Sequence, residues 1–127
     1  MAEGYWNPIA KQGTWTLNMG RNTYTTIDTH YVIIGDSLVF ARANFTLTGQ
    51  TDSGNSYVDL HDSNLPEPKS YASIIGTWQV DTLNKSGIMT SSPYANKWTA
   101  WFMVTDSRTA LTDYVGNTMS LVMIYEI

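Results

Sequence analysis

The sequence feature that most constrains the fold is a two-residue alternation that runs through residues 31–48. Its second half places apolar side chains on one side of the repeat and polar ones on the other: Val39, Ala41, Ala43, Phe45 and Leu47 against Arg42, Asn44, Thr46 and Thr48. Strict alternation of this length is typical of a β-strand with one buried and one solvated face. Residues 27–33 alternate in the same way, so we expect two neighbouring strands.

Gly35 and Asp36 lie between the two runs and indicate a hairpin turn, because both residues tolerate positive φ. A two-residue loop would place Asp28 on the core side, where an unpaired carboxylate costs several kcal/mol. A three-residue loop ending at Ser37 avoids this cost. It pairs Ile33 with Val39, Tyr31 with Ala41 and His30 with Arg42. We therefore expect the longer loop or a bulge.

Other β-patterned runs follow at intervals of about 8–12 residues, separated by loops rich in Gly, Pro, Asn and Ser. We expect strands within residues 13–19, 23–34, 57–60, 71–83, 88–90, 98–105 and 118–127. Irregular loops are expected at residues 49–56, 61–70, 91–97 and 106–117. No run has the pattern of a long helix. Residues 1–127 are therefore predicted to form a single all-β domain, an antiparallel β-sandwich of jelly-roll type.

The composition limits the partners of such a domain. Charged residues make up only 14% of the chain, well below the ~25% usual for soluble domains, so Thr, Ser, Asn and aromatic groups must cover the surface. This is the surface of extracellular β-proteins, lectins and viral shells. A net charge of −4 with seven scattered basic residues argues against nucleic acid. No apolar run reaches ~18 residues, so no membrane insertion is expected.

Two of the expected strands are apolar on both faces. In residues 98–104, one side carries Trp98, Ala100, Phe102 and Val104, and the other carries Trp101 and Met103. In residues 118–127, Met119, Leu121, Met123, Tyr125 and Ile127 lie opposite Val122 and Ile124. A two-layer sandwich has little room for strands buried on both faces. The second face is expected to pack against another copy of the chain or, alternatively, under residues 106–117 or 1–13.

Several short motifs resemble the C-terminal receptor-binding domains of phage tail-fibre proteins. The segment GYWNP at residues 4–8 resembles the Gly-x-Trp-Thr-Pro opening of that family. Tyr24, the segment YVIIGDSLVF at residues 31–40 and the apolar closing run at residues 121–127 follow in the family's order. NLP at residues 64–66 stands where the family has Gly-Leu-Pro-Phe. Asn7, Asn64 and Glu67 depart from the family's Thr, Gly and Phe, which leaves the loop around Pro66 in question.

The resemblance implies a trimeric β-sandwich at the tip of a fibre. Such a domain binds a host cell-surface receptor, commonly a saccharide, so the protein would be part of a virion and act outside the cell. Residues 1–13 would lead into the domain from a preceding fibre or shaft. The family implies no catalytic residues and no cofactor.

The inventory of reactive side chains also favours binding over catalysis. His30 and His61 are the only histidines and there is no cysteine, so a zinc site would have at most two good ligands. A calcium site is conceivable at Asp52, Asn55, Asp59 and Asp62, which lie close together in the sequence. Their spacing differs from that of an EF-hand loop, and turn capping explains these residues better. We expect neither an enzyme nor a bound metal.

Candidate ligand-binding residues lie in three loops. Aromatic rings offer flat apolar faces to the C–H side of a sugar, and nearby polar groups take up its hydroxyls. One loop carries Tyr94, Asn96 and Trp98, the second carries His61, Asp62 and Asn64, and the third carries Asp52 and Asn55. Trp98 begins an expected strand, so a place in the core is an alternative for it.

Three other functions remain open at this stage. The chain could be a purely structural trimerisation or fibre-cap domain, or a carbohydrate-binding module of non-viral origin. GTW at residues 13–15 and again at residues 76–78 also resembles the Gly-Thr-Trp of avidin-like biotin binders. The two-faced last strand argues against this third function, because a ligand-binding barrel needs polar groups pointing inward.

Overall fold

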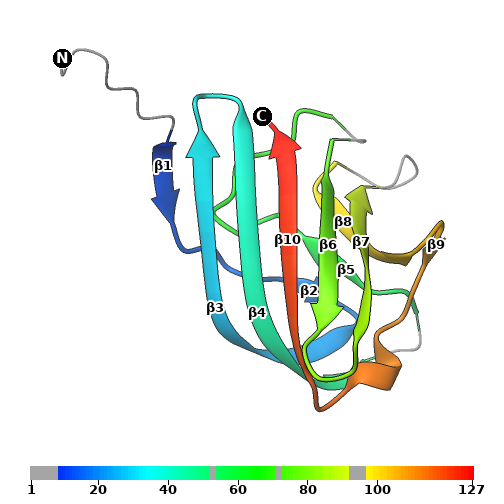
Figure 1. Cartoon of the computed structure of the whole chain (residues 1–127). Helices are drawn as coiled ribbons and strands as arrows, with labels where there is room; N and C mark the ends of the chain where they lie inside the picture. The colour runs from blue at the N-terminus through cyan, green and yellow to red at the C-terminus, as the bar shows by residue number, and fades with distance from the viewer. Residues whose placement is uncertain (1–8, 52–53, 71–72, 92–96) are drawn as a thin grey trace.

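The computed structural model of the protein describes residues 9–51, 54–70, 73–91 and 97–127. These residues form one antiparallel sheet, which curls around a hydrophobic core (Figure 1). Its strands are β1 (Ile9–Gly13), β2 (Met19–Gly20), β3 (Asn22–Ile34), β4 (Leu38–Gln50), β5 (Tyr57–Asp59), β6 (Ile75–Val80), β7 (Lys85–Ser91), β8 (Thr99–Val104), β9 (Ser107–Arg108) and β10 (Thr118–Glu126). The prediction of an all-β antiparallel domain is confirmed.

The order of the strands explains how a single sheet encloses a core. Neighbours run β1-β3-β4-β10-β6-β7-β8-β5-β2, with β9 beside β8. In Figure 1, β3, β4, β10, β6 and β7 lie across the front, and β8, β5 and β2 lie behind them. The side chains enclosed between front and back are fully buried and include Phe45, Leu47, Trp78, Phe102 and Met119. Among the described residues the only helical element is the 3-10 turn η1 (Thr112–Tyr114), and no helix could cross a membrane.

The β3–β4 hairpin has the predicted register. Ile33 pairs with Val39, Tyr31 with Ala41 and His30 with Arg42, across a loop at residues 35–37. A bulge at Ile27 resets the pairing before Asp28, which remains on the solvated side. There its carboxylate accepts a hydrogen bond from Asn44 at 2.7 Å and lies 3.4 Å from the Arg42 guanidinium. The observed register therefore leaves Asp28 solvated and paired, as expected.

The prediction of a strand at residues 13–19 is wrong, although its burial pattern is right. Trp15 and Leu17 are buried, but residues 14–18 make no strand ladder. The Thr29 hydroxyl accepts from the Trp15 amide at 3.1 Å and donates to the Trp15 carbonyl at 2.6 Å. A side chain thus satisfies backbone groups that a neighbouring strand would otherwise pair. Of the predicted leading segment, Ile9–Gly13 forms β1 and pairs with β3, and residues 1–8 lie outside the described part.

The two strands predicted to be apolar on both faces each have one buried and one half-buried side. In β10, Met119, Leu121 and Met123 are at most 1% exposed, whereas Val122 and Ile124 on the outer face are only half-buried. In β8, Phe102 is buried, and Trp101 and Met103 are half-buried. Within the loop at 106–117, Leu111 is buried in the core and the Tyr114 ring lies 5.8 Å from that of Trp78. This loop therefore packs on the core.

A tyrosine side chain links β2, the strand at one end of the sheet order, to β3. β2 pairs with β5 on one side. On its other side, the Tyr24 hydroxyl accepts from the Met19 amide at 3.2 Å and donates to the Leu17 carbonyl at 2.6 Å. Tyr24 belongs to β3, so these two bonds close the curl where no ladder does.

We expect Tyr24→Phe to lower the free energy of unfolding by about 1–3 kcal/mol, because it leaves two partly buried backbone groups without their partner. Urea unfolding measures this loss. Tyr114→Phe is the matched control, since among the described residues the Tyr114 hydroxyl has no hydrogen bond, and a change below about 0.5 kcal/mol is expected for it. Equal losses in the two variants would contradict the closing role of Tyr24.

Tyr125 makes the stability of the fold sensitive to alkaline pH. Its buried hydroxyl donates to the Pro66 carbonyl at 2.7 Å, and burial raises its pKa above the usual value near 10. The unfolded chain therefore ionises first. We expect stability to be retained up to about pH 10 and to fall above it, with a shallower fall in Tyr125→Phe. Urea unfolding across this pH range measures both slopes, and identical slopes would contradict the prediction.

Candidate functional site

Two of the three predicted ligand loops meet where β5 ends and β8 begins. The Leu60 amide donates to the Trp98 carbonyl at 2.8 Å, which places residue 61 beside residue 98. The rings of His61 and Trp98 stack with centroids 4.6 Å apart and an interplanar angle of 28°. His61 is exposed and Trp98 is half-buried, so the pair forms an aromatic surface open to solvent.

Asp59 fixes the position of the His61 ring. Its carboxylate oxygen Oδ1 accepts from the His61 amide at 2.9 Å and lies 2.8 Å from Nδ1 of the ring. Asn18 extends this polar group, because its side-chain amide donates to the His61 carbonyl at 3.0 Å and its own carbonyl accepts from the Asp59 amide at 2.8 Å. These contacts bring the Asp59 carboxylate, the His61 imidazole and the Asn18 carboxamide together at the start of β2 and the end of β5.

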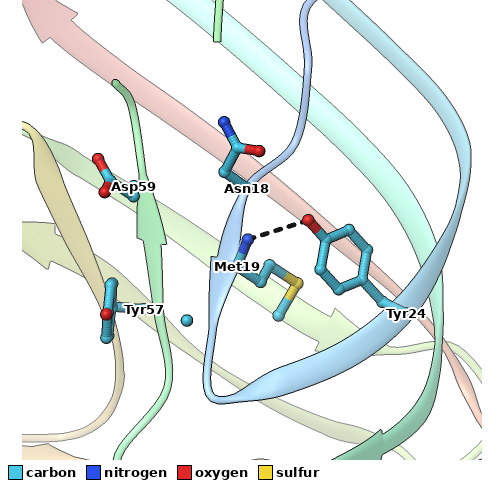
Figure 2. Close-up of a pocket in the computed structure, with 6 residues that line it drawn as sticks. Asn18, Met19, Tyr24, Tyr57 and Asp59 are labelled. Atoms are coloured by element: carbon cyan, nitrogen blue, oxygen red, sulfur yellow. Dashed lines mark hydrogen bonds between the residues drawn. The ribbon is translucent and has the colours of Figure 1, made fainter. Parts of the chain in front are cut away.

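A hollow of about 270 Å³ lies next to these groups (Figure 2). Gly20 contributes no side chain to it, and the Tyr57 ring lies across Gly20 so closely that an added Cβ would be 2.2 Å from Tyr57 Cζ. Pockets for drug-sized ligands span roughly 300–1,000 Å³, so the hollow suits one small ring. It is lined by Asn18, Met19, Gly20, Tyr24, Tyr57 and Asp59.

Aromatic surface continues from the hollow onto β8. The rings of Tyr57 and Trp101 pair across the strands with centroids 4.8 Å apart. The Arg21 guanidinium lies 5.9 Å from the Tyr57 ring, and that of Arg108 lies 4.1 Å from the Trp101 ring. Cation–π contacts of this kind hold the rings in place, and they leave a half-buried aromatic row beside the hollow.

The structure separates the remaining predicted residues. Asp62 and Asn64 are exposed in the turn after His61, where both have positive φ, 57° and 71°. Asn55 lies at the opposite end of β5, and its carbonyl accepts from Arg21 at 3.1 Å. Tyr94, Asn96 and Asp52 lie outside the described residues. His61, Asp62, Asn64 and Trp98 therefore belong to one end of β5, and Asn55 to the other.

Sequence reasoning missed Asn18, Tyr57 and Asp59 as members of a common site. Tyr57 and Asp59 flank the buried Val58 and so share the outer side of β5, a signal present in the sequence. Asn18 carries no such signal, because it reaches the site through the pairing of β2 with β5, whose partners are about 40 residues apart in the chain.

The arrangement is suited to binding a small, uncharged, hydroxyl-rich ligand. A carboxylate accepts hydroxyl protons, a carboxamide can donate and accept, and ring faces cover apolar C–H surface. Within the described parts of the chain, no group of three or more His, Cys, Asp or Glu side chains is placed to hold a metal ion.

No family model matches the chain, and no curated protein and no solved structure is significantly similar to it. A role for these residues can therefore be proposed only from their chemistry and geometry. The Asp59–His61 contact, the His61–Trp98 stack and the adjoining hollow are the features from which that proposal starts.

Substituting Gly20 tests the packing that forms the hollow. Gly20→Ala forces the Tyr57 ring to move, so we expect a loss of about 1–3 kcal/mol in the free energy of unfolding and changed NMR shifts for that ring. Gly13→Ala is the control, since its Cβ would make an ordinary 3.4 Å contact with the ring of Tyr31. If Gly20→Ala matched that control, the Tyr57 ring would not be held against Gly20.

Proposed function

We propose that this chain is the receptor-binding domain at the tip of a phage-like tail fibre, and that it recognises a saccharide on the host-cell surface as a homotrimer. The motif resemblance at residues 4–8, 31–40 and 121–127 supports the fibre assignment. We further propose that the curled sheet is a variant of the jelly-roll sandwich of that family, with the front strands as one layer and β8, β5 and β2 as the other.

The observation that carries the saccharide proposal is the group formed by Asp59, His61 and Trp98 beside the hollow. A pyranose ring in the hollow would place hydroxyls against the Asp59 carboxylate and the Asn18 carboxamide. Asp59 favours the imidazole tautomer with its proton on Nδ1, which leaves Nε2 of His61 to accept from a further hydroxyl. The Tyr57 ring and the exposed part of the Trp98 ring offer surface to the sugar's C–H groups.

The charges of the site favour an uncharged sugar. The chain carries a net charge of −4, and Asp59 places a carboxylate at the edge of the hollow. An acidic sugar would bring a second carboxylate or sulfate close to it, and like charges at short range are unfavourable. Three identical weak sites on one assembly would raise avidity by ~10²–10⁴.

A purely structural fibre cap is the second candidate, and one observation favours it. The bonds of Asn18 and Asp59 to the His61 loop also tie the ends of β2 and β5 together, so they have a structural use without any ligand. A biotin-like barrel is less well supported. Both tryptophans of the Gly-Thr-Trp motifs, Trp15 and Trp78, are buried and donate their indole N–H groups to backbone carbonyls, so they fill the core.

Glycan-array binding followed by titration tests the saccharide proposal. We expect wild type to bind neutral glycans, and we expect Asp59→Asn and Trp98→Ala each to lower the affinity by about 10- to 100-fold. For Asp59→Asn, the range follows from the roughly 1.5–3 kcal/mol contributed by a hydrogen bond to a charged group, and for Trp98→Ala from the lost ring surface, since fully burying one large apolar side chain contributes about 1.5–3 kcal/mol. Asp113→Asn removes an exposed carboxylate on η1 and is the control, expected to bind as wild type.

Both site variants must retain the wild-type circular dichroism spectrum and assembly state for their binding data to count. A folded wild type that binds no glycan would favour the structural cap. Binding that survives both substitutions would place the saccharide site elsewhere on the domain.

A further inference from the structure

The outer face of the front strands carries a row of apolar side chains that crosses the sheet. The strand registers place Val32, Phe40, Ile124 and Ile75 next to one another on β3, β4, β10 and β6. The neighbouring row brings Val122 beside Thr77 and Thr77 beside Ile88. Ile75 is 61% exposed and Ile88 is 42% exposed, and the other apolar members of the two rows are half-buried.

Three adjacent strands of this front face, β10, β6 and β7, carry no outward-facing charged side chain along their central parts. The outward-facing residues are uncharged along the central parts of three strands: Thr118, Ser120, Val122 and Ile124 on β10, Ile75, Thr77 and Gln79 on β6, and Ser86, Ile88 and Thr90 on β7. On β4, Arg42 pairs with Val122 of β10 and lies 3.4 Å from Asp28 of β3, so this ion pair borders the uncharged strands on one side. A charge-depleted centre with a polar margin distinguishes the core of a protein interface from ordinary surface.

The same face contains a projecting side chain and a hollow. Ile75 is the most exposed large apolar residue described. A shallow hollow of about 130 Å³ lies between the side chains of Thr77, Gln79, Ser120 and Val122, and its volume is comparable with that of one branched aliphatic side chain. Ile75 cannot fill this hollow in its own chain. Ile75 pairs with Ile124 of β10. Ser120, which borders the hollow, lies four residues from Ile124 along the same strand, a distance of about 13 Å.

The size of the front face is sufficient for a specific contact. Five strands about 4.8 Å apart and a seven-residue length of about 20 Å give roughly 500 Å² on each copy. Two copies facing each other would therefore bury about 1,000 Å², which is the lower limit for a specific interface. A contact of this size is expected to depend on protein concentration.

We propose that the front face is the contact surface for another copy of this chain, and that Ile75 of one copy sits in the hollow formed by Thr77, Gln79, Ser120 and Val122 of the next. A surface that carries both a projection and a matching hollow can join copies of the same chain, either reciprocally in a pair or head to tail in a ring of three, which an unrelated partner would not require. This inference rests on the assembly part of the proposed function, whose trimer needs the head-to-tail arrangement, and is independent of its ligand.

Disulfide trapping tests the seating of Ile75 directly, because the chain has no cysteine of its own. In Ile75→Cys/Ser120→Cys, the two sites within one copy are too far apart to bond, since disulfides need Cα atoms within about 7 Å. We expect mild oxidation to give disulfide-linked oligomers. Val104→Cys/Ser120→Cys is the matched control, because Val104 is 42% exposed on β8, which lies behind the front strands, and it should remain unlinked.

The outcomes separate this inference from the proposed function. Linked species that end at three copies support both the contact and the trimer, whereas a ladder that ends at two supports the contact and contradicts the trimer. No linkage in the double variant, or equal linkage in Ile75→Cys alone, would overturn the seating of Ile75 in the hollow. Glycan binding by an unlinked chain would leave the saccharide part of the proposed function standing.

Sedimentation over a range of concentrations gives a second, independent measurement. Wild type should associate, Ile75→Asp should be monomeric with an unchanged fold, and Val104→Asp, on β8 behind the front strands, should associate as wild type. A wild type that is monomeric throughout, or an Ile75→Asp variant that associates normally, would overturn the proposed contact surface.

Discussion

The structure depends on burying one face of a single antiparallel sheet. A sheet that encloses its own core must curl, and the curl brings its end strand β2 back to the start of β3, where no ladder joins the two. Tyr24 of β3 links them by bonding the backbone at Leu17 and Met19. On the opposite, outer side of the curl, half-buried apolar residues remain on β10 and β8. The candidate binding site and the apolar front face are both consequences of this one-sided burial.

The candidate binding site lies where the curl brings short strands together. β2 and β5 have only two and three residues, so the groups at their ends lie close enough to bond one another. Asp59 orients His61, His61 stacks on Trp98, and Gly20 makes room for the ring of Tyr57. A rigid arrangement of this kind reduces the entropy lost when a ligand is bound. The same contacts stabilise the strand ends, so these residues have a structural role in addition to the proposed binding role.

The low content of charged residues has different consequences on the two sides of the molecule. On β2, β5 and β8, polar and aromatic side chains surround a hollow that suits a hydroxyl-rich ligand. Across β10, β6 and β7, the outward-facing side chains are apolar or uncharged, which favours a protein partner. The proposed fibre-tip function uses both surfaces, one for the receptor and one for assembly.

The sequence by itself determined the long hairpin and its register, because residues 39–48 alternate strictly and only one register keeps Asp28 out of the core. It also predicted β10 as a strand, but not which of its two apolar sides is buried. His61 and Trp98 were predicted as candidate loop residues, and the structure stacks their rings. The sequence did not determine that residues 14–18 lie outside any strand, because alternating burial of Trp15 and Leu17 looks the same whether a ladder or Thr29 satisfies the backbone. Only the tertiary structure brought Asn18, Tyr57 and Asp59 to His61, since the pairing of β2 with β5 joins distant segments through backbone groups that every residue has.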